Sequence, residues 1–303
     1  MTGRVDIMNS KRLMKRETVY SVLGIIPALT IFLAFTYYPL ISTLKYSFTN
    51  WDGFSRNYDF VGISNFINIF KEEDVIKSFW NTIYFAIASM VLGITVQLTL
   101  AVFLYENFKG KNVIRAIFYL PCVISQLIVS LTWLGFFQYT GVINEALRAI
   151  GLDKLVVDWL GNPATVKNVL VFINTWQWAG YGMVIFLAGL NSVPADVYES
   201  ALLDGAKGIK KFFYITLPLI MPSVTVTTFI GITGALKIFD MPYILTGGGP
   251  LNASLTLSMS IYNNAFSYER FGYSSSIGLV FFVFIAVVTI IQLRLTRRME
   301  VEL

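Results

Sequence analysis

The stretch Asn81-Thr-Ile-Tyr-Phe-Ala-Ile-Ala-Ser-Met-Val-Leu-Gly-Ile-Thr-Val-Gln-Leu-Thr-Leu-Ala-Val-Phe-Leu-Tyr105 contains no charged side chain in 25 consecutive positions. About 20 predominantly apolar residues of α-helix are needed to cross the hydrocarbon core of a bilayer. The stretch is long enough for one crossing, and its polar side chains are uncharged. It therefore predicts a transmembrane helix, and similar stretches occur on both sides of it.

Six such stretches predict an all-α, polytopic membrane protein with six transmembrane helices. The weaker stretch Leu255–Phe266 is interrupted by Asn263 and Asn264, and we expect an interfacial or partly buried outer helix there instead of a seventh span. The sixth stretch has only 17 residues. The predicted spans are Val19–Leu40, Asn81–Tyr105, Val113–Phe137, Val169–Leu190, Leu219–Phe239 and Ile277–Leu293.

The composition of the 303-residue chain agrees with a location in lipid. Hydrophobic residues make up 55% and charged residues 14%, whereas a soluble domain carries about 25% charged residues. The chain has no histidine, which excludes histidine metal sites and histidine general bases. The net charge of +5 comes largely from basic residues beside the apolar stretches, so it indicates membrane topology and not a nucleic-acid partner.

A basic N-terminal segment precedes the first apolar stretch, as in a secretory signal peptide. However, Val19–Leu40 has 22 residues, whereas the apolar part of a signal peptide has about 7–15. No cleavage site of small residues follows it. We therefore expect a retained first span.

Lysine and arginine are enriched in the cytoplasmic segments of membrane proteins. If the N-terminus is cytoplasmic, the segments on its side of the membrane carry 14 of these residues and the opposite segments carry 8. Six spans return the C-terminus to the same side. The expected organisation is a cytoplasmic tail at 1–18, a six-helix transmembrane domain at 19–295 and a cytoplasmic tail at 296–303, in the plasma membrane.

The fourth connection, about 191–218, has a distinctive sequence on the predicted cytoplasmic side. Pro194 suits the first turn of a helix. Gly205 can end that helix in a left-handed conformation. A second short helix, Ile209–Leu217, is expected to lead to Pro218 and the next span. The pattern predicts a helix, a glycine turn and a second helix on the membrane surface.

This connection resembles the EAA loop of ABC importer permeases, whose pattern is Glu-Ala-Ala, then Asp-Gly-Ala, then Ile-x-Leu-Pro. The matching residues are Glu199-Ser200-Ala201, Asp204-Gly205-Ala206 and Ile215-Thr216-Leu217-Pro218, with serine replacing one alanine. An ordinary amphipathic loop is the alternative interpretation. Four further stretches are similar to the carbohydrate branch of this family: Tyr46–Asn50, Phe60–Phe66, Ala116–Pro121 and Thr246–Pro250.

The resemblance covers nearly the whole chain and is closest to sugar permeases of the maltose, glycerol-phosphate and multiple-sugar type. It implies a type I ABC importer permease core, in which the EAA loop forms a coupling helix that docks into an ATPase subunit. The implied coupling residues are Glu199, Ser200, Ala201, Asp204, Gly205, Ala206, Leu217 and Pro218.

The same resemblance implies the partners and the mechanism. The partners would be a second, dissimilar permease subunit, an ATPase subunit dimer, an extracellular solute-binding protein, a carbohydrate substrate and membrane lipid, with no nucleic acid. The chain contains no G-x-x-x-x-G-K-[ST] phosphate loop. We therefore expect a non-catalytic transport subunit that binds no cofactor, with ATP used by the partner subunit and alternating access of the pathway.

Polar and aromatic residues gather in the fourth span, in Asn174-Thr-Trp-Gln-Trp-Ala-Gly-Tyr181. Sugar sites combine ring faces with groups that pair with hydroxyls, because a buried unpaired hydroxyl is costly. The spacing i, i+3, i+4, i+7 predicts one substrate-binding helical face. An aromatic belt at the outer membrane boundary is the alternative. The residues on this face are Asn174, Gln177, Trp178 and Tyr181.

Lys237 and Asp240 lie near the end of the fifth span. Charges in spans usually face a cavity or one another, so the two residues are expected either to bind substrate or to form an outer ion pair. The related maltose permeases have an asparagine-rich stretch at this place, from which this sequence departs. Thr246–Pro250 is expected first to be a flexible turn; the resemblance also implies a role near the pathway mouth or the binding protein.

The sequence argues against two other classes of function. An ion-coupled secondary transporter would show internal repeats and carboxylates in mid-membrane, but only Asp240 lies near a span. An intramembrane enzyme would need clustered acids or a nucleophile with its base, and the sequence shows neither.

Overall fold

The computed structural model describes residues 24–301. This part of the chain is helical, and its only β pairing is an isolated bridge between Thr49 and Phe60. Five of its helical segments are long and apolar enough to cross a membrane, and a sixth candidate consists of two segments bent by 73° at Ile220. The all-α fold with six membrane spans is therefore confirmed.

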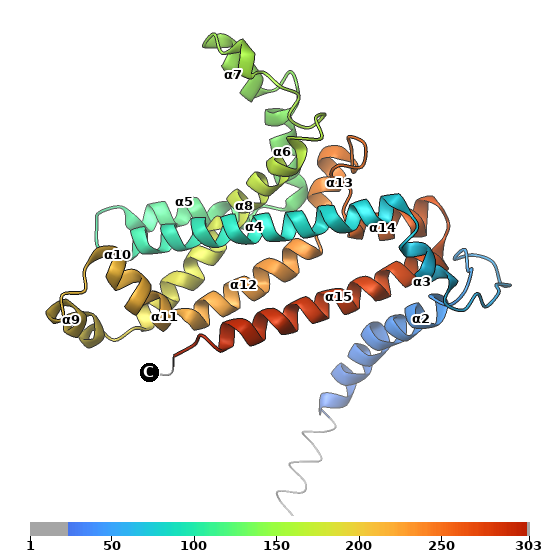
Figure 1. The fold of residues 1–303 in the computed structure, drawn as a ribbon, viewed down its shortest axis with the longest axis horizontal. Helices are drawn as coiled ribbons and strands as arrows, with labels where there is room; N and C mark the ends of the chain where they lie inside the picture. Colours follow the sequence, from blue (N-terminus) through green and yellow to red (C-terminus); the bar gives the residue numbers. More distant parts are fainter. Residues whose placement is uncertain (1–23, 302–303) are drawn as a thin grey trace, which may run out of the picture.

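The elements follow one another along the chain as labelled in Figure 1. Their bounds are η1 Leu33–Tyr37, α2 Tyr38–Tyr46, α3 Ser64–Ile69, α4 Glu73–Tyr105, α5 Lys111–Val123, α6 Gln126–Phe137, α7 Val142–Ala149, η2 Asp153–Leu155, α8 Val166–Ser192, α9 Ala195–Leu203, α10 Gly208–Lys211, η3 Phe212–Thr216, α11 Leu217–Leu219, α12 Met221–Leu236, α13 Asp240–Thr246, α14 Leu257–Tyr262, η4 Asn263–Ser267 and α15 Phe271–Arg297.

The bundle is built around α4, which packs against α8 and α12, while α12 also packs against α15. Figure 1 shows α4, α12 and α15 side by side along the long axis of the molecule. Two apolar cores fill the space between the helices. One contains Phe85, Met241 and Ile277; the other, which reaches the segment 191–218, contains Leu104 and Phe186.

Two glycines allow α8 to approach its neighbours closely. A Cβ atom at Gly180 would lie 2.1 Å from the carbonyl oxygen of Phe118 in α5. A Cβ atom at Gly182 would lie 2.1 Å from Oε1 of Gln97 in α4. Small residues at helix contacts in membranes serve this close approach, so α5, α4 and α8 form one tightly packed unit.

The predicted third span, Val113–Phe137, is not one helix. It consists of α5 and α6, separated by Ile124 and Ser125 in extended conformation. Pro121 removes one helical hydrogen bond, and the Ser125 hydroxyl accepts a bond from the amide of Ile128 (3.4 Å), which starts a new helix. α5 packs against α8, whereas α6 rises away from the bundle in Figure 1.

The other predicted spans have the right positions but different ends. The first helix reaches Tyr46 instead of Leu40, and the start of the predicted span, together with the tail 1–18, lies outside the described residues. The sixth span is the 27-residue helix α15, longer than the apolar stretch that predicted it. These helices continue past the apolar stretches because polar residues can extend a helix beyond the hydrocarbon core.

The stretch predicted as an outer helix, Leu255–Phe266, forms α14 and η4. Its side chains Leu257, Met259 and Asn264 are buried, and it packs against α4 and α15. It is not among the candidate spans, which confirms a partly buried helix that does not cross the membrane.

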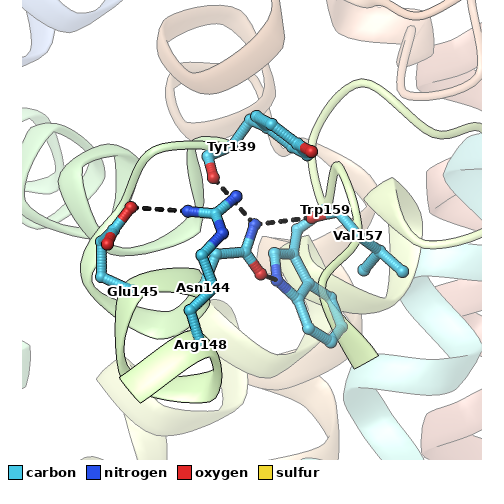
Figure 2. A network of polar contacts seen from close by, with 6 residues as sticks. All are labelled: Tyr139, Asn144, Glu145, Arg148, Val157 and Trp159. Carbon is cyan, nitrogen blue, oxygen red and sulfur yellow. Dashed lines mark hydrogen bonds and ion pairs between the residues drawn. The ribbon is translucent and has the colours of Figure 1, made fainter. Parts of the chain in front are cut away.

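The segment 138–165 lies at the tip of the arm that α6 forms (Figure 1). Asn144, which is fully buried, holds this segment together. Its amide donates to the carbonyl oxygens of Tyr139 (3.0 Å) and Val157 (2.8 Å), and its Oδ1 accepts from the indole of Trp159 (2.9 Å), as Figure 2 shows. The tip is therefore a fixed structure.

Within residues 24–301, the segments that the charge pattern places on the cytoplasmic side lie at one end of the bundle. The connection 106–110, the helices α9 to α11 and the C-terminal end are together there, and α3 and α14 lie at the opposite end (Figure 1). Which end faces the cytoplasm stays a prediction.

Candidate functional site

A cavity of about 290 Å³ lies between α4, α8 and α12, beside the segment that joins α12 to α13. Its walls carry three aromatic rings, several uncharged polar side chains and two charged ones. The lining residues are Ser89, Gly93, Gln97, Gln126, Asn174, Thr175, Trp178, Tyr181, Thr227, Ile230, Gly231, Gly234, Ala235, Lys237, Ile238, Phe239, Asp240 and Met241.

Three of the four residues predicted on the face of the fourth span line this cavity: Asn174, Trp178 and Tyr181. The rings of Trp178 and Tyr181 meet edge to face, with centroids 5.9 Å apart. Trp178 is 40% exposed, so its ring has free surface. The role of these residues in sugar binding stays a prediction.

Gln177, the fourth residue, does not line the cavity. It is buried, and its amide donates to the carbonyl oxygen of Ile124 in the break between α5 and α6 (3.4 Å). Successive helical residues are 100° apart, so Gln177 and Thr175 lie at opposite edges of the face that carries Asn174, Trp178 and Tyr181. The cavity lies on the Thr175 side, and its lining therefore includes Thr175 and not Gln177. The predicted face was wrong by this one residue.

Four residues that line the cavity each have one polar atom that is buried without a hydrogen-bond partner in the described chain. These atoms are Ser89 Oγ, Gln126 Nε2, Thr175 Oγ1 and Thr227 Oγ1. A buried polar atom left unpaired costs about 1–3 kcal/mol. If these side chains turned toward the cavity, a hydroxyl-rich molecule there would give their polar atoms partners. The sequence signal for them was the presence of uncharged polar residues inside apolar spans.

Lys237 and Asp240 line the same cavity at the break between α12 and α13. Lys237 follows the last residue of α12 and Asp240 is the first of α13, so each charge suits the helix end beside it. The predicted alternative of a mutual ion pair is wrong, because the ion pairs within residues 24–301 are Glu145–Arg148 and Glu72–Arg270. The helix ends separate the two charged groups and leave both available to the cavity.

The connection 191–218 has the predicted helix, glycine turn and second helix. Gly205 adopts a φ of +79° after α9. The amide of Gly205 donates to the carbonyl oxygen of Leu202 (3.1 Å), and that of Ala206 donates to Ala201 (2.9 Å). This pair of bonds is the Schellman end of a helix, which favours glycine at the left-handed position.

The inner face of this connection is anchored in the second apolar core, where Val197, Tyr198 and Leu217 pack around Ile220. Ala201 is buried as well. Burial raises the pKa of the Tyr198 hydroxyl above its ordinary value. The connection is therefore tied to the base of α12 through its packed side.

The outer face of the connection exposes large apolar side chains. Leu203 is 89% exposed and Tyr214 is 81% exposed. Leu202, Ile209 and Phe213 are exposed as well. Beside them, Glu199, Ser200 and Asp204 are also exposed. We call this surface, made of residues 199–214, the coupling surface, after the role that the sequence resemblance predicts for it.

The turn around Thr246–Pro250 leads into a loop that α4 holds in place, so the loop as a whole is not free. Lys77 donates to the carbonyl oxygen of Leu251, and the amide of Asn81 donates to the carbonyl oxygens of Asn252 (2.8 Å) and Leu255 (3.0 Å). Asp74 accepts from the side-chain amide of Asn252 (2.7 Å). The turn itself is held as well, because the Ser254 hydroxyl donates to the carbonyl oxygen of Gly249 (2.7 Å) and lies 2.6 Å from the Thr246 hydroxyl. The expectation of a flexible turn is corrected by these hydrogen bonds.

Comparison with known proteins identifies relatives over nearly the whole chain. The chain is 33% identical to the multiple sugar-binding transport system permease protein MsmF of Streptococcus mutans over 267 residues, which cover 88% of this chain and 91% of the relative. It is 32% identical to the trehalose/maltose transport system permease protein MalF of Thermococcus litoralis over 289 residues, which cover 95% and 97%.

A solved structure, of a bacterial alginate ABC transporter in complex with an alginate pentasaccharide-bound periplasmic protein, contains a chain with the same fold. The TM-score is 0.81 at 26% identity, with 95% of this chain and 96% of that chain covered. A family model described as the inner membrane component of binding-protein-dependent transport systems matches residues 89–301. That description is of a transport component and not of an enzyme. The chain therefore belongs to the family of inner-membrane components of binding-protein-dependent transport systems.

Proposed function

We propose that this protein forms the translocation pathway for a sugar or oligosaccharide in an ATP-driven importer, to which an extracellular binding protein delivers the substrate. The cavity between α4, α8 and α12 carries the proposal. The relatives MsmF and MalF are named for multiple sugars and for trehalose and maltose, and the solved alginate transporter is in complex with a periplasmic protein that holds an alginate pentasaccharide.

The chemistry of the cavity suits a carbohydrate. Trp178 and Tyr181 offer ring surface for the apolar faces of a sugar ring, and Asn174 adds an amide group to the same cavity wall. The unpaired polar groups of Ser89, Thr175 and Thr227 are buried beside the cavity, and they can donate to or accept from sugar hydroxyls once their side chains turn toward it. Lys237 and Asp240 add one charge of each sign, so the charged groups of the wall do not favour a strongly charged substrate.

The coupling surface is the proposed contact with the ATPase subunits. Exposed apolar patches often mark sites of protein association, and here Leu203 and Tyr214 are exposed on the same connection as the carboxylates of Glu199 and Asp204. ATP binds to the partner ATPase in this proposal, and this chain binds no cofactor.

The orientation follows from the charge pattern. Both termini and the coupling surface face the cytoplasm, and the loop around Leu251 faces outward. A second, dissimilar permease subunit completes the pathway, and a dimer of ATPase subunits drives it. ATP binding shifts the equilibrium between outward-open and inward-open states, which is alternating access.

Replacement of the cavity aromatics tests the sugar site. Trp178→Ala and Tyr181→Ala, measured in the assembled transporter with its binding protein in proteoliposomes, should each lower sugar uptake by about tenfold, which corresponds to the loss of about 1.4 kcal/mol. ATPase activity stimulated by the binding protein should persist, since the coupling surface lies at the other end of the bundle.

Trp176→Ala is the matched control. Trp176 lies in the same helix and is 38% exposed, but it packs edge to face against Trp133 outside the cavity (centroids 5.2 Å apart). Its replacement should leave uptake per transporter unchanged. If uptake by Trp178→Ala, normalised to the amount of transporter in the membrane, equals that of Trp176→Ala, the cavity is not the sugar pathway.

A further inference from the structure

A second groove, of about 460 Å³, lies between α4 and the start of α8. None of its lining residues lines the sugar cavity. Its wall is a stripe along one side of α4, with the ring of Trp80 followed by Ile83, Tyr84, Ile87 and Ala88. Residues spaced three, four and seven apart share a helical face, so the stripe is continuous.

One cation, Lys167 of α8, lies at this groove. Its Nζ is 5.0 Å from the centroid of the Tyr84 ring and donates to Oδ1 of Asn81 (3.4 Å). The Tyr84 hydroxyl in turn donates to Oδ1 of Asn168 (2.5 Å), which fixes the ring. The ammonium group therefore has a defined position in the groove, with donor capacity to spare, since a lysine has three N–H donors.

The surroundings in the described chain leave the charge of Lys167 unbalanced. The ion pairs within residues 24–301 do not involve it. It is the second residue of α8, and the helix dipole disfavours a cation at a helix N-terminus. Neither a paired carboxylate nor the helix end therefore stabilises the positive charge of Lys167. An anion bound over the groove would stabilise it.

The groove also has the features of a membrane boundary. Trp80 is 62% exposed and Tyr84 is 40% exposed, and tryptophan and tyrosine are enriched where a bilayer meets water. Ile87, one helical turn further along α4, is 53% exposed. The groove thus runs from a cation and two amphipathic rings to a purely apolar surface, as a phospholipid runs from its phosphate to its acyl chain.

We propose that this groove binds an anionic phospholipid, with the phosphate at Lys167 and an acyl chain along Ile83 and Ile87. The proposal depends on the membrane location of the family and not on the identity of the transported sugar. A lipid held here would bridge the ends of α4 and α8, two helices that also form the cavity.

The test uses the assembled transporter in detergent, with phosphatidylglycerol or phosphatidylcholine added in mixed micelles. Native mass spectrometry counts the retained lipids, and thermal unfolding measures the stabilisation that ligand binding produces. Phosphatidylglycerol should bind more tightly than phosphatidylcholine. Lys167→Gln should weaken its binding by about fivefold, the contribution of one lysine at an anionic surface.

Lys154→Gln is the matched control, because Lys154 is an exposed lysine in η2 outside the groove. It should keep the full effect of phosphatidylglycerol. Equal binding of the two lipids, an unchanged effect in Lys167→Gln, or the same stabilisation by inorganic phosphate alone would each overturn the proposal. It would also be overturned if Lys167→Gln dissociated the second permease subunit and left lipid binding unchanged, because the groove would then be a subunit interface.

Discussion

Gly205 has a φ of +79°, and nothing lies within 4 Å of the position that a Cβ atom would take. A side chain therefore fits sterically, and the cost of a substitution comes from the backbone conformation alone. A left-handed conformation costs an L-residue roughly 1–2 kcal/mol, and asparagine tolerates it better than a β-branched residue.

Gly205→Val should therefore reshape the turn between α9 and α10 and lower both sugar uptake and association with the ATPase. Gly205→Asn should keep most of both. Uptake and ATPase retention during purification check the pair of variants. Normal uptake by Gly205→Val would remove the argument that the shape of this turn matters for coupling.

Asp52, in the loop before α3, gives a pH-dependent prediction. Hydrogen bonds from the Ser55 hydroxyl (2.5 Å) and from the backbone amides of Ser55 and Phe54 lower the pKa of its carboxyl from 3.8 to about 2. Because the folded pKa lies below the unfolded value, the contribution of these bonds is fully present above about pH 4. It is lost as the pH falls toward 2.

Hydrogen exchange of the peptide containing Phe54 and Ser55 can follow this change. After correction for the intrinsic pH dependence of exchange, protection should fall between pH 4 and pH 2 in the natural protein. Asp52→Asn should be less protected at pH 5 and should show no such transition. Constant protection in the natural protein down to pH 2 would contradict the prediction.

At the scale of single residues, the sequence located the cavity but not its full wall. Helical spacing correctly placed Asn174, Trp178 and Tyr181 on one face. It could not exclude Gln177 from that face, because the side chain of Gln177 is directed by the carbonyl group that Ile124 presents after the end of α5. The contributions of Ser89 and Thr227 from other helices could not be assigned, since helix rotation follows from packing and not from local sequence.

At the scale of elements, the contact between α8 and α5 depends on Gly180. Gly180→Ala should drive its methyl group against the backbone of Phe118, and a clash with backbone cannot be relieved by a rotamer change. Overpacking of this kind costs about 1–3 kcal/mol, so the thermal midpoint of the purified transporter should fall.

Gly135→Ala is the control, since Gly135 lies inside α6 and no atom lies within 4 Å of its Cβ position. Alanine is favoured over glycine in a helix by up to about 1 kcal/mol, so this variant should unfold at the same or a higher temperature. Equal thermal midpoints for the two variants would show that the close approach of α8 to α5 does not limit stability.

The limits of sequence reasoning at this scale lie at helix ends and breaks. Hydropathy detects the apolar part of a span, so it missed the polar turns at both ends of α15. It also could not see the break after Val123, because the residues on both sides are equally apolar. Pro121 and the capping Ser125 were the available signals.

At the scale of the whole molecule, the membrane orientation can be tested directly. In a Cys122→Ser background, Asn57→Cys should react with a membrane-impermeant thiol reagent from outside intact cells, and Lys207→Cys only after the membrane is opened. Both positions are exposed. Labelling of Lys207→Cys in intact cells would place the coupling surface outside and refute its contact with an ATPase.

The fold of the whole chain was predictable because the bilayer permits few solutions. Backbone polar groups in lipid must be paired within the chain, which leaves helices for apolar stretches of this length. The arrangement of the spans was not predictable in the same way. The direction of α6 away from the bundle depends on the geometry of the break at Ile124 and Ser125, and no composition rule supplies it.

Because the chain bends at Ile220, a rotation of α12 about this residue would be amplified along the length of the helix. The helix has 16 residues, a length of roughly 24 Å at 1.5 Å per residue. Its base is joined to the coupling surface, and at its tip Lys237 lines the cavity. A rotation of about 10° around Ile220 would sweep the tip through roughly 4 Å, more than the length of a hydrogen bond. A small displacement at the base of α12 is thus enough to exchange one set of side-chain contacts in the cavity for another.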